Sequence, residues 1–339
     1  MELSAYTTLR LGGPAARLVE ATSDDAVIDA VRAADEAGEP VLLLAGGSNV
    51  VVADEGFDGI VVRIATTGVT RDGDVLRVAA GEPWDAFVAR CVEHGRSGIE
   101  ALSGIPGSVG ATPIQNVGAY GQEVAESLTD VRVYDRRTGE VADLTPADCG
   151  FGYRTSAFKR DPSRWVVLRV GVALAPGGVS QPIRYDELAR ALGVELGATA
   201  PVADVREAVL ALRRGKGMVL DPGDPDTRSA GSFFTNPILA PEQLAAIERR
   251  AGERPPAWPE ADGRVKTSAA WLIQRAGFTR GYGNPGGIAI SSKHVLALTN
   301  RGAGTTAELV ALAREIADRV EDAFGVRLVP EPVFVGHAW

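Results

Sequence analysis

The residues from Gly104 to Gly121 read GIPGSVGATPIQNVGAYG, which is too apolar for a solvent loop and too interrupted for a helix or a strand. Five glycines and two prolines fall in this stretch. Proteins use glycine where a Cβ would clash or where φ must be positive. Both needs arise where the backbone approaches a flat or phosphorylated ligand and offers its N–H groups to an anion. A run of buried turns would produce the same pattern, so this stretch by itself leaves both interpretations open.

A second glycine loop lies upstream. The short apolar strand expected at Pro40–Ala45 leads directly into the sequence Gly-Gly-Ser-Asn-Val at residues 46–50. A strand followed by a glycine pair and small polar residues is typical of a phosphate cradle, although the pattern is common. Two such loops favour one long ligand held at two points, and a dinucleotide with its pyrophosphate fits. The glycine spacing is not G-x-G-x-x-G, so the Rossmann argument does not apply.

Composition limits the classes of protein and partner. A chain of 339 residues exceeds one ordinary core, so two or three subdomains are expected. The formal net charge of −9 argues against nucleic acid as a partner, although local arginines can still hold an anionic substrate. Cys91 and Cys149 offer neither a disulfide framework nor metal-ligand spacing. The sequence shows no signal peptide and no apolar run of membrane-spanning length, so we expect a cytoplasmic protein.

Hydrophobic periodicity and turn residues predict a mixed helix and strand protein that opens with a β-α-β unit. The expected strands are Ala16–Ala21, the one at Pro40, Gly59–Ile64, Val75–Ala80, Val131–Asp135, Glu140–Leu144, Trp165–Leu174, Val295–Thr299 and Val326–Val335. The expected helices are Ser23–Ala37, Trp84–His94, Tyr185–Leu192, Pro201–Gly217, Ala240–Arg250, Ser268–Ala276 and Thr305–Phe324. Pro255–Gly263 is expected to be a surface loop.

Ser232 follows a glycine and precedes two phenylalanines. A capping serine in a turn is the simple interpretation. The alternative is a serine in a dry pocket, and no G-x-S-x-G motif or serine-linked histidine supports hydrolase chemistry. A serine hydroxyl without a base is so weak an acid that it can protonate only a very basic carbon, such as an enolate. That chemistry points to the reduction of an activated double bond.

Three further residues have both a structural and a functional interpretation. Arg154 lies beside Tyr153 and could form a surface ion pair or hold a ligand's carboxylate. Glu331, between two prolines, is either an edge-strand charge or a fixed catalytic group. Lys216 follows two arginines at an expected helix end, where basic residues complement the helix dipole in any case.

Together, in this order, these motifs resemble the UDP-N-acetylenolpyruvoylglucosamine reductase family, the FAD-dependent enzymes that make UDP-N-acetylmuramate for bacterial peptidoglycan. The resemblance covers nearly the whole chain. Its carriers are Ala45–Asn49, Gly104–Gly107, Pro113–Asn116, Gly118–Gly121, Phe151–Arg154, Gly231–Phe234 with Asn236-Pro237, and Pro330-Glu331. Gln181–Tyr185 is similar to the subtype whose mobile tyrosine lies over the diphosphate.

The resemblance implies an α+β fold with a two-subdomain FAD-binding module of the vanillyl-alcohol-oxidase (PCMH) type plus a smaller α/β substrate-binding domain. The expected boundaries are 1–65 for FAD-binding subdomain 1, 66–205 for subdomain 2, and 206–325 for the substrate-binding domain. The C-terminal strand, 326–339, is expected to return to subdomain 2. We expect a monomer.

The resemblance also implies a reaction. NADPH reduces a non-covalently bound FAD, which then passes hydride to the enolpyruvyl ether of a UDP-sugar. Ser232 matches the family's proton donor, while Arg154 and Glu331 match the pair at the substrate carboxylate. A glutamate helps there only when it is protonated or hydrogen-bonded, because a second bare anion would repel the first. The implied cofactor-binding residues are Gly46, Gly47, Ser48, Asn49, Val50, Gly104, Gly107, Gly110, Pro113, Gln115, Asn116, Gly118, Ala119 and Tyr120. The implied substrate-binding residues are Tyr185, Lys216 and Asn236, and no metal is implied.

Two other functions remain in competition. A flavin oxidase of the same FAD-binding class would use oxygen, and many such oxidases attach flavin through histidine or cysteine, which neither glycine loop contains. A non-catalytic sugar-nucleotide binding protein would not need a second nucleotide loop. The chain departs from its relatives at Gly217–Leu220, at Thr235 and at Pro332-Val333, which affects nucleotide and flavin contacts more than the reaction.

Overall fold

The computed structural model describes residues 1–339, and the chain divides into two compact units. Unit 1 comprises Met1, Ala15–Gly47 and Phe57–Gly215. Unit 2 comprises Glu2–Pro14, Ser48–Gly56 and Lys216–Trp339. None of the helices has both the length and the apolarity needed to cross a membrane.

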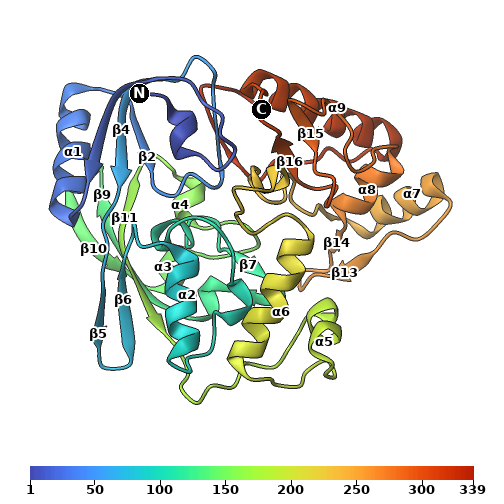
Figure 1. The fold of residues 1–339 in the computed structure, drawn as a ribbon, viewed down its shortest axis with the longest axis horizontal. Coiled ribbons are helices and arrows are strands. Elements are labelled where there is room, and N and C mark those ends of the chain that lie inside the picture. Colours follow the sequence, from blue (N-terminus) through green and yellow to red (C-terminus); the bar gives the residue numbers. More distant parts are fainter. The chain divides into compact units, whose positions relative to one another are not determined.

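Unit 1 contains a three-stranded parallel sheet covered by one helix (Figure 1). Its strands, in spatial order, are β1 (Ala15–Ala21), β4 (Phe57–Ile64) and β2 (Val41–Leu44), and its helix is α1 (Asp24–Ala37). The Ser23 hydroxyl caps α1 by accepting a hydrogen bond from Ala26 N, and Gly38 ends the helix with a φ of +67°. Val27 and Val31 of α1 belong to one buried cluster with residues of β4, so helix burial holds the sheet.

A five-stranded antiparallel sheet forms the larger part of unit 1. Its strands, in spatial order, are β10 (Glu140–Leu144), β9 (Leu128–Asp135), β11 (Trp165–Ala173), β6 (Val75–Ala79) and β5 (Val69–Asp72). Tyr134 of β9 and Leu168 of β11 lie in the same buried cluster as the apolar face of α1. The two sheets of unit 1 therefore share a core.

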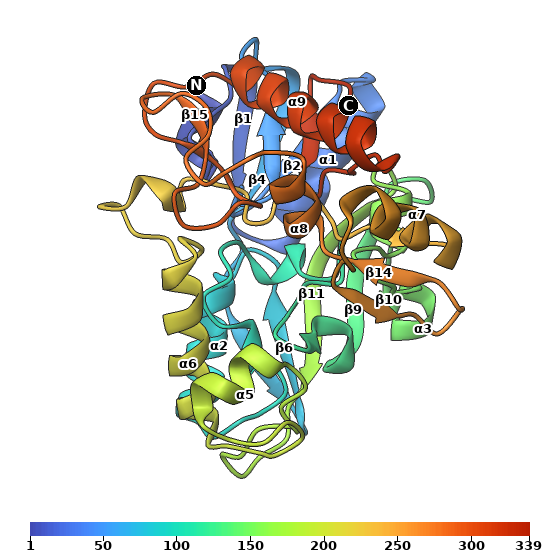
Figure 2. The same cartoon turned by 90° about the vertical axis from the view of Figure 1, so that its right-hand side faces the viewer.

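Helices α2 (Trp84–Glu93) and α6 (Val202–Gly215) lie side by side in unit 1 (Figure 2). The Arg206 guanidinium of α6 donates to both carboxylate oxygens of Asp85 on α2, at 2.6 and 3.1 Å. Trp84 and Phe87 bury the other side of α2 in the core of the five-stranded sheet. The remaining short elements are α3 (Pro146–Cys149), α4 (Ala157–Arg160), α5 (Asp186–Leu192), β7 (Gly118–Ala119), β8 (Gln122–Glu123) and the 3₁₀ turns η2 (Glu100–Leu102), η3 (Val109–Ala111) and η4 (Val124–Glu126).

Unit 2 is organised around the long helix α9 (Thr306–Phe324), red in Figure 1. The backbone N–H groups of Thr306 and Ala307 donate to the Asp54 carboxylate at 2.8 and 2.9 Å, so an acid sits at the positive end of the helix. Asp54 follows β3 (Val50–Val52), which pairs in parallel with β17 (Val333–Val335). Strand β3 and the adjacent Asp54 are thereby joined to β17 and to the N-terminus of α9.

The rest of unit 2 consists of two small antiparallel sheets and two helices. The strands are β12 (Ile238–Leu239), β14 (Val265–Thr267), β13 (Ala257–Pro259), β15 (Ile288–Ile290) and β16 (Leu298–Asn300), the helices are α7 (Pro241–Ala251) and α8 (Ala269–Arg275), and η1 (Leu3–Tyr6) and η5 (Pro225–Thr227) are 3₁₀ turns. One buried cluster joins α7, α8 and α9 to β15 and β16.

Most expected elements are confirmed to within a few residues, including the β-α-β opening, the hairpin of β9 and β10, and α9. Three expectations were wrong in part. Pro255–Gly263 contains β13, and the strand expected at Val295–Thr299 begins only at Leu298. The strand expected over Val326–Val335 is only β17, because Pro330 and Pro332 have no N–H to donate.

The expected domain boundaries, 1–65, 66–205 and 206–325, divide the chain into three parts, whereas it separates here into two compact units. The C-terminal strand pairs with β3 of unit 2 rather than with residues 66–205. The three-part division stays a prediction.

Candidate active site

The two glycine loops meet inside unit 1. A Cβ built on Gly46 would lie 2.6 Å from Gly107 Cα, so the two backbones touch directly and leave no room for a side chain. Gly47 and Gly107 have φ values of +57° and +118°, a region that side chains disfavour. The two glycine loops are therefore in direct contact at Gly46 and Gly107, and their sharing of one ligand site stays a prediction.

Backbone hydrogen bonds fix the loop that contains Gly107 and Gly110. Gly107 O accepts from Trp84 N at 3.0 Å, and Gly110 N donates to Ala80 O at 2.8 Å. Gly104 N donates to Asp85 Oδ1 at 2.6 Å. These bonds attach the loop to the end of β6 and to the first turn of α2, which are rigid elements.

Asp85 has a low pKa. Burial by itself would raise the pKa of this carboxyl, but hydrogen bonds from the Arg206 guanidinium and from Gly104 N favour the charged form and leave the pKa below its usual range. A charged Asp85 therefore holds the start of the loop at neutral pH. The sequence analysis missed this residue, because an acid in the first turn of a helix is usually explained by the helix dipole.

Ser108 supplies a test of whether the loops fit FAD. Its hydroxyl is buried between Gly107 and Gly110 and has no hydrogen-bond partner within the protein. A buried hydroxyl without a partner is costly, which indicates that an acceptor from outside the chain belongs there. A phosphate oxygen held by glycine N–H groups would provide one. The glycine contact and this hydroxyl together fit a dinucleotide such as FAD, although the sequence analysis did not single out Ser108.

Asn116 links the central loop to the turn that carries Arg154. Asn116 is buried with a φ of +46°, and its side-chain amide donates to Glu123 at 2.7 Å and to Gly152 O at 3.2 Å. Its carbonyl oxygen accepts from Ala125 N at 3.2 Å. Its side chain therefore holds the loop together from within. Pro113 and Gln115 precede it in the same segment.

Arg154 is directed at the central loop. Its guanidinium donates to Gly118 O at 2.8 Å and lies over the Tyr153 ring, with 5.6 Å between Cζ and the ring centroid. Its φ of +53° is uncommon for a residue other than glycine, and such strain gathers at functional sites. Gly118 and Ala119 form β7, so Arg154 reaches the expected cofactor segment.

Tyr120 and Tyr185 are neighbours in unit 1, with ring centroids 5.5 Å apart in an edge-to-face contact. Burial raises the pKa of Tyr120 to about 12, so its hydroxyl stays protonated at neutral pH. The side chain of Tyr185 is exposed and immediately precedes α5. An expected cofactor residue and an expected substrate residue thus lie side by side.

In unit 2 the backbone brings Ser232 and Glu331 close. Phe233, the residue after Ser232, accepts a hydrogen bond at its carbonyl from Glu331 N at 2.8 Å. Phe234 forms a bridge with Pro330, and both phenylalanines are fully buried. The two segments are far apart in the sequence and adjacent in the fold.

The second glycine loop continues into this part of unit 2. Asn49 Nδ2 donates to Glu331 O at 3.3 Å, and Asn49 O accepts from Val333 N at 3.0 Å. Val50 opens β3 and is paired with Val333. Ser48 O accepts from the Thr8 hydroxyl at 3.5 Å. The residues expected at the cofactor therefore also position Glu331.

Lys216 opens a loop that is anchored by charges missed in the sequence analysis. A Cβ on the next residue, Gly217 (φ +67°), would lie 3.2 Å from Asp226 Cβ. The buried Asp226 carboxylate accepts from Ser292 N at 3.1 Å and from the Arg301 guanidinium at 2.7 Å. The only signal in the sequence was a polar, aspartate-rich loop. In the same unit, Asn236 Oδ1 accepts from Ala269 N at 3.0 Å, which leaves the Asn236 amide N–H groups as donors.

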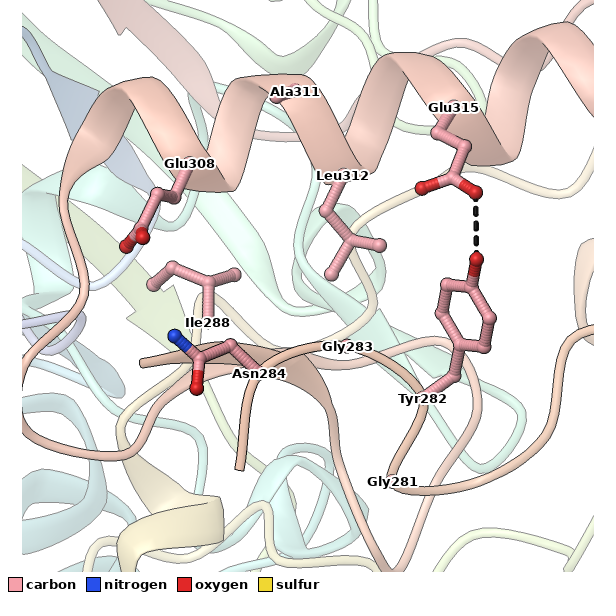
Figure 3. Close-up of a pocket in the computed structure, with 9 residues that line it drawn as sticks. All are labelled: Gly281, Tyr282, Gly283, Asn284, Ile288, Glu308, Ala311, Leu312 and Glu315. Atoms are coloured by element: carbon pink, nitrogen blue, oxygen red, sulfur yellow. Dashed lines mark hydrogen bonds between the residues drawn. The ribbon is translucent and has the colours of Figure 1, made fainter. Parts of the chain in front are cut away.

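A surface pocket of unit 2 lies between α9 and the loop before β15 (Figure 3). None of the residues expected at the site lines it. Its two carboxylates are engaged within the protein, since Glu315 accepts from the Tyr282 hydroxyl at 2.7 Å and Glu308 from Thr305 N at 3.0 Å. This pocket carries none of the expected chemistry.

The site residues are divided between the two units. Unit 1 holds Arg154, Tyr185 and most of the expected cofactor residues, while unit 2 holds Ser48, Asn49, Val50, Lys216, Ser232, Asn236 and Glu331. Cys91 and Cys149 are buried in unit 1, and burial raises the pKa of each thiol to about 12. Both thiols stay protonated at neutral pH and are poor nucleophiles.

Two family models match different parts of the chain. Residues 224–335 match the family model described as UDP-N-acetylenolpyruvoylglucosamine reductase, C-terminal domain, and residues 15–145 match the model of an FAD binding domain. The chain is 60% identical over 343 residues to the UDP-N-acetylenolpyruvoylglucosamine reductase of Streptomyces coelicolor, which covers 99% of this chain and 89% of that one. It is 58% identical over 346 residues to the reductase of Thermobifida fusca, covering 98% of this chain and 96% of that one.

Among solved structures, the crystal structure of UDP-N-acetylenolpyruvylglucosamine reductase from Thermus caldophilus is similar with a TM-score of 0.66 and 26% identity. The similarity covers 99% of this chain and 97% of that one. The expected α+β fold with an FAD-binding module is thereby confirmed. By its sequence over nearly its full length, the chain belongs to the UDP-N-acetylenolpyruvoylglucosamine reductase family.

Proposed function

We propose that the protein is an FAD-dependent oxidoreductase that reduces UDP-N-acetylglucosamine enolpyruvate to UDP-N-acetylmuramate in peptidoglycan synthesis, with NADPH as the electron donor. The observation that carries this proposal is family membership over nearly the whole chain, with 60% identity to the Streptomyces coelicolor reductase. The contact of the two glycine loops and the unpartnered Ser108 hydroxyl support FAD as the cofactor.

The glycine loops, Gly46–Gly47 and Gly104–Gly110, would hold FAD together with Ser48, Asn49 and the segment from Pro113 to Tyr120. When bound, FAD supplies the hydride that reaches the terminal carbon of the enolpyruvyl group. The backbone N–H groups of these loops would stabilise the cofactor's phosphates by their fixed dipoles. Asp85 and Asn116 keep this backbone in place.

Three side chains would act on the substrate. Arg154 binds the enolpyruvyl carboxylate and stabilises the negative charge that grows on it as the enolate forms. Ser232 Oγ donates its proton to the carbon next to that carboxylate, which is basic enough to accept one from a hydroxyl. Glu331, whose backbone is fixed by Phe233 and Asn49, lies in the segment next to the proton donor.

Tyr185, Lys216 and the free amide N–H groups of Asn236 would contact the nucleotide part of the substrate. Lysine and amide N–H groups suit the anionic oxygens of a diphosphate. The Asp226 network supports this role, because it fixes the loop that begins at Lys216. A monomeric state and a cytoplasmic location remain predictions.

The test is anaerobic. The purified protein is reduced with one equivalent of NADPH while the flavin absorbance is followed, and the enolpyruvyl ether is then added. Return of the oxidised flavin spectrum is expected with the ether and not with UDP-N-acetylglucosamine, which lacks the enolpyruvyl group. Reoxidation by air alone would favour an oxidase. Purified protein without flavin would overturn the proposal and favour a sugar-nucleotide binding protein.

A further inference from the structure

Four aromatic rings meet in unit 2, beside the segments that carry Ser232 and Glu331. Phe233 lies 5.2 Å from Phe234 and 6.3 Å from Phe334, measured between ring centroids. Trp339 closes the group, 6.0 Å from Phe234 and 5.7 Å from Phe334. All four distances are those of favourable aromatic pairs.

Trp339 reaches this cluster because the chain turns back after β17. Gly336 has a φ of +76°, and a Cβ there would lie 2.7 Å from Ala53 Cβ, so only glycine fits the turn without a shift. The Arg314 guanidinium of α9 donates to Ala338 O at 2.7 Å and holds the returning segment. The placement of Trp339 is therefore built by specific contacts on both sides.

The cluster ties together the two segments that matter for protonation. Phe233 directly follows Ser232, and its carbonyl holds Glu331 N. Phe334 lies on β17, just beyond Glu331. Trp339 touches one ring from each segment, Phe234 and Phe334, so its indole bridges the Ser232 side and the Glu331 side.

We propose that Trp339 is a positioning residue, which sets the spacing of Ser232 and Glu331 through Phe234 and Phe334. The inference rests on the proposed roles of Ser232 and Glu331 in protonating the substrate. An aromatic contact changes an equilibrium by roughly 2- to 10-fold, and a catalytic group displaced by 1 Å can lose about 100-fold in rate. Loss of Trp339 should therefore slow proton donation and leave electron entry unchanged.

The first experiment compares Trp339→Ala with Trp339→Phe and with the control Trp258→Ala. Trp258 is also exposed and also in unit 2, but lies on β13 in another sheet. We expect reoxidation of the reduced flavin by the enolpyruvyl ether to slow roughly 10-fold in Trp339→Ala and to stay within about 2-fold of wild type in Trp339→Phe. In Trp339→Ala the rate of flavin reduction by NADPH should equal that of wild type. In the control Trp258→Ala both half-reactions should run at the wild-type rates. Equal slowing of both half-reactions, or equal slowing in the control, would overturn the inference.

A second measurement does not depend on the reaction. Amide hydrogen exchange of residues 231–237 and 329–335 reports on the hydrogen bonds of Phe233, Thr235 and Glu331. We expect roughly 5-fold faster exchange there in Trp339→Ala, with recovery in Trp339→Phe and no change in α1. Unchanged exchange in Trp339→Ala would overturn the inference even in an active reductase. Failure of wild-type protein to reoxidise with the ether would instead overturn the proposed function.

Discussion

In unit 1 the contact between Gly46 and Gly107 excludes any Cβ, whereas in unit 2 the segments of Ser232 and Glu331 are joined by a backbone hydrogen bond and by the packing of phenylalanine rings. The first arrangement depends on steric room, which is either present or absent. The second depends on the sum of several contacts, each of modest worth. A single mutation in the cofactor loops should therefore abolish flavin binding, while mutations around Ser232 and Glu331 should lower the reaction rate by graded amounts.

The largest expected effect tests the steric half of this comparison. In Gly46→Ala the new methyl would lie 2.6 Å from Gly107 Cα, so the two loops must separate. We expect the purified protein to contain almost no flavin, as measured by the ratio of flavin to protein absorbance.

The control for Gly46→Ala is Gly139→Ala in the hairpin of β9 and β10. Gly139 has a φ of +75° and no neighbour within 4 Å of an added Cβ, so that variant carries backbone strain of about 1–2 kcal/mol without a clash. It should keep its flavin. Full flavin content in Gly46→Ala would contradict the steric account.

The second effect concerns chemistry in unit 2. Ser232→Ala should slow flavin reoxidation by the enolpyruvyl ether by roughly 10²- to 10⁴-fold, the usual contribution of a general acid. Flavin content and reduction by NADPH should be unchanged, as followed by stopped-flow absorbance. The control is Ser268→Ala, which removes the cap of α8 and should cost about 1 kcal/mol in stability without slowing reoxidation. Equal losses in both half-reactions of Ser232→Ala would indicate a structural role.

The smallest expected effect is electrostatic and concerns how the charge of Asp85 holds the Gly104 loop of unit 1. Because the pKa of Asp85 is lowered in the folded state, its contribution to stability is complete above the unfolded value of about 3.9 and is lost as the pH falls through the folded value. Lowering the pH below about 4 should therefore release the Gly104 loop and with it the flavin. In Asp85→Asn, flavin affinity at pH 7 should fall a few-fold. The additional release of flavin at low pH should be smaller than in wild type.

Asp262→Asn is the matched control for Asp85→Asn. Hydrogen bonds from Arg264 also lower the pKa of Asp262, but this pair is exposed in unit 2 and far in sequence from the glycine loops. Its substitution should leave flavin release unchanged across the pH range. The measurement is flavin fluorescence on release, titrated from pH 7 to pH 3. If acid releases the same amount of flavin from Asp85→Asn as from wild type, groups other than Asp85 control the loop.

Much of the fold could be predicted because its signals are local. Ser23 and Gly38 mark the ends of α1, and a run rich in valine marks β11. Short strands such as β13 and β15 were missed, since three residues show no period and take their identity from the partner strand. The part of the expected strand that precedes β17 does not form, because Pro330 and Pro332 have no N–H to donate.

In the candidate site, too, residues in local motifs could be predicted and residues defined by distant contacts could not. Arg154, Ser232 and Glu331 could be named from their motifs, while Asp85, Ser108, Asp226 and Trp339 could not. Those four matter through what they touch, and their partners lie elsewhere in the chain. Asp85 holds Gly104, and Trp339 contacts both the nearby Phe334 and the Phe234 ring, which is distant in the sequence.

The sequence by itself determined the family, and it predicts the glycine loops for the cofactor and the residues for catalysis, because glycine spacing and side-chain type are properties of the chain alone. Only the tertiary structure decided which backbone atoms meet at Gly46 and Gly107, and which backbone bond and aromatic rings join the segments of Ser232 and Glu331. The physical reason is that steric exclusion and packing act between residues that are distant in sequence. Their partners are set by the complete fold, and local patterns carry no record of them.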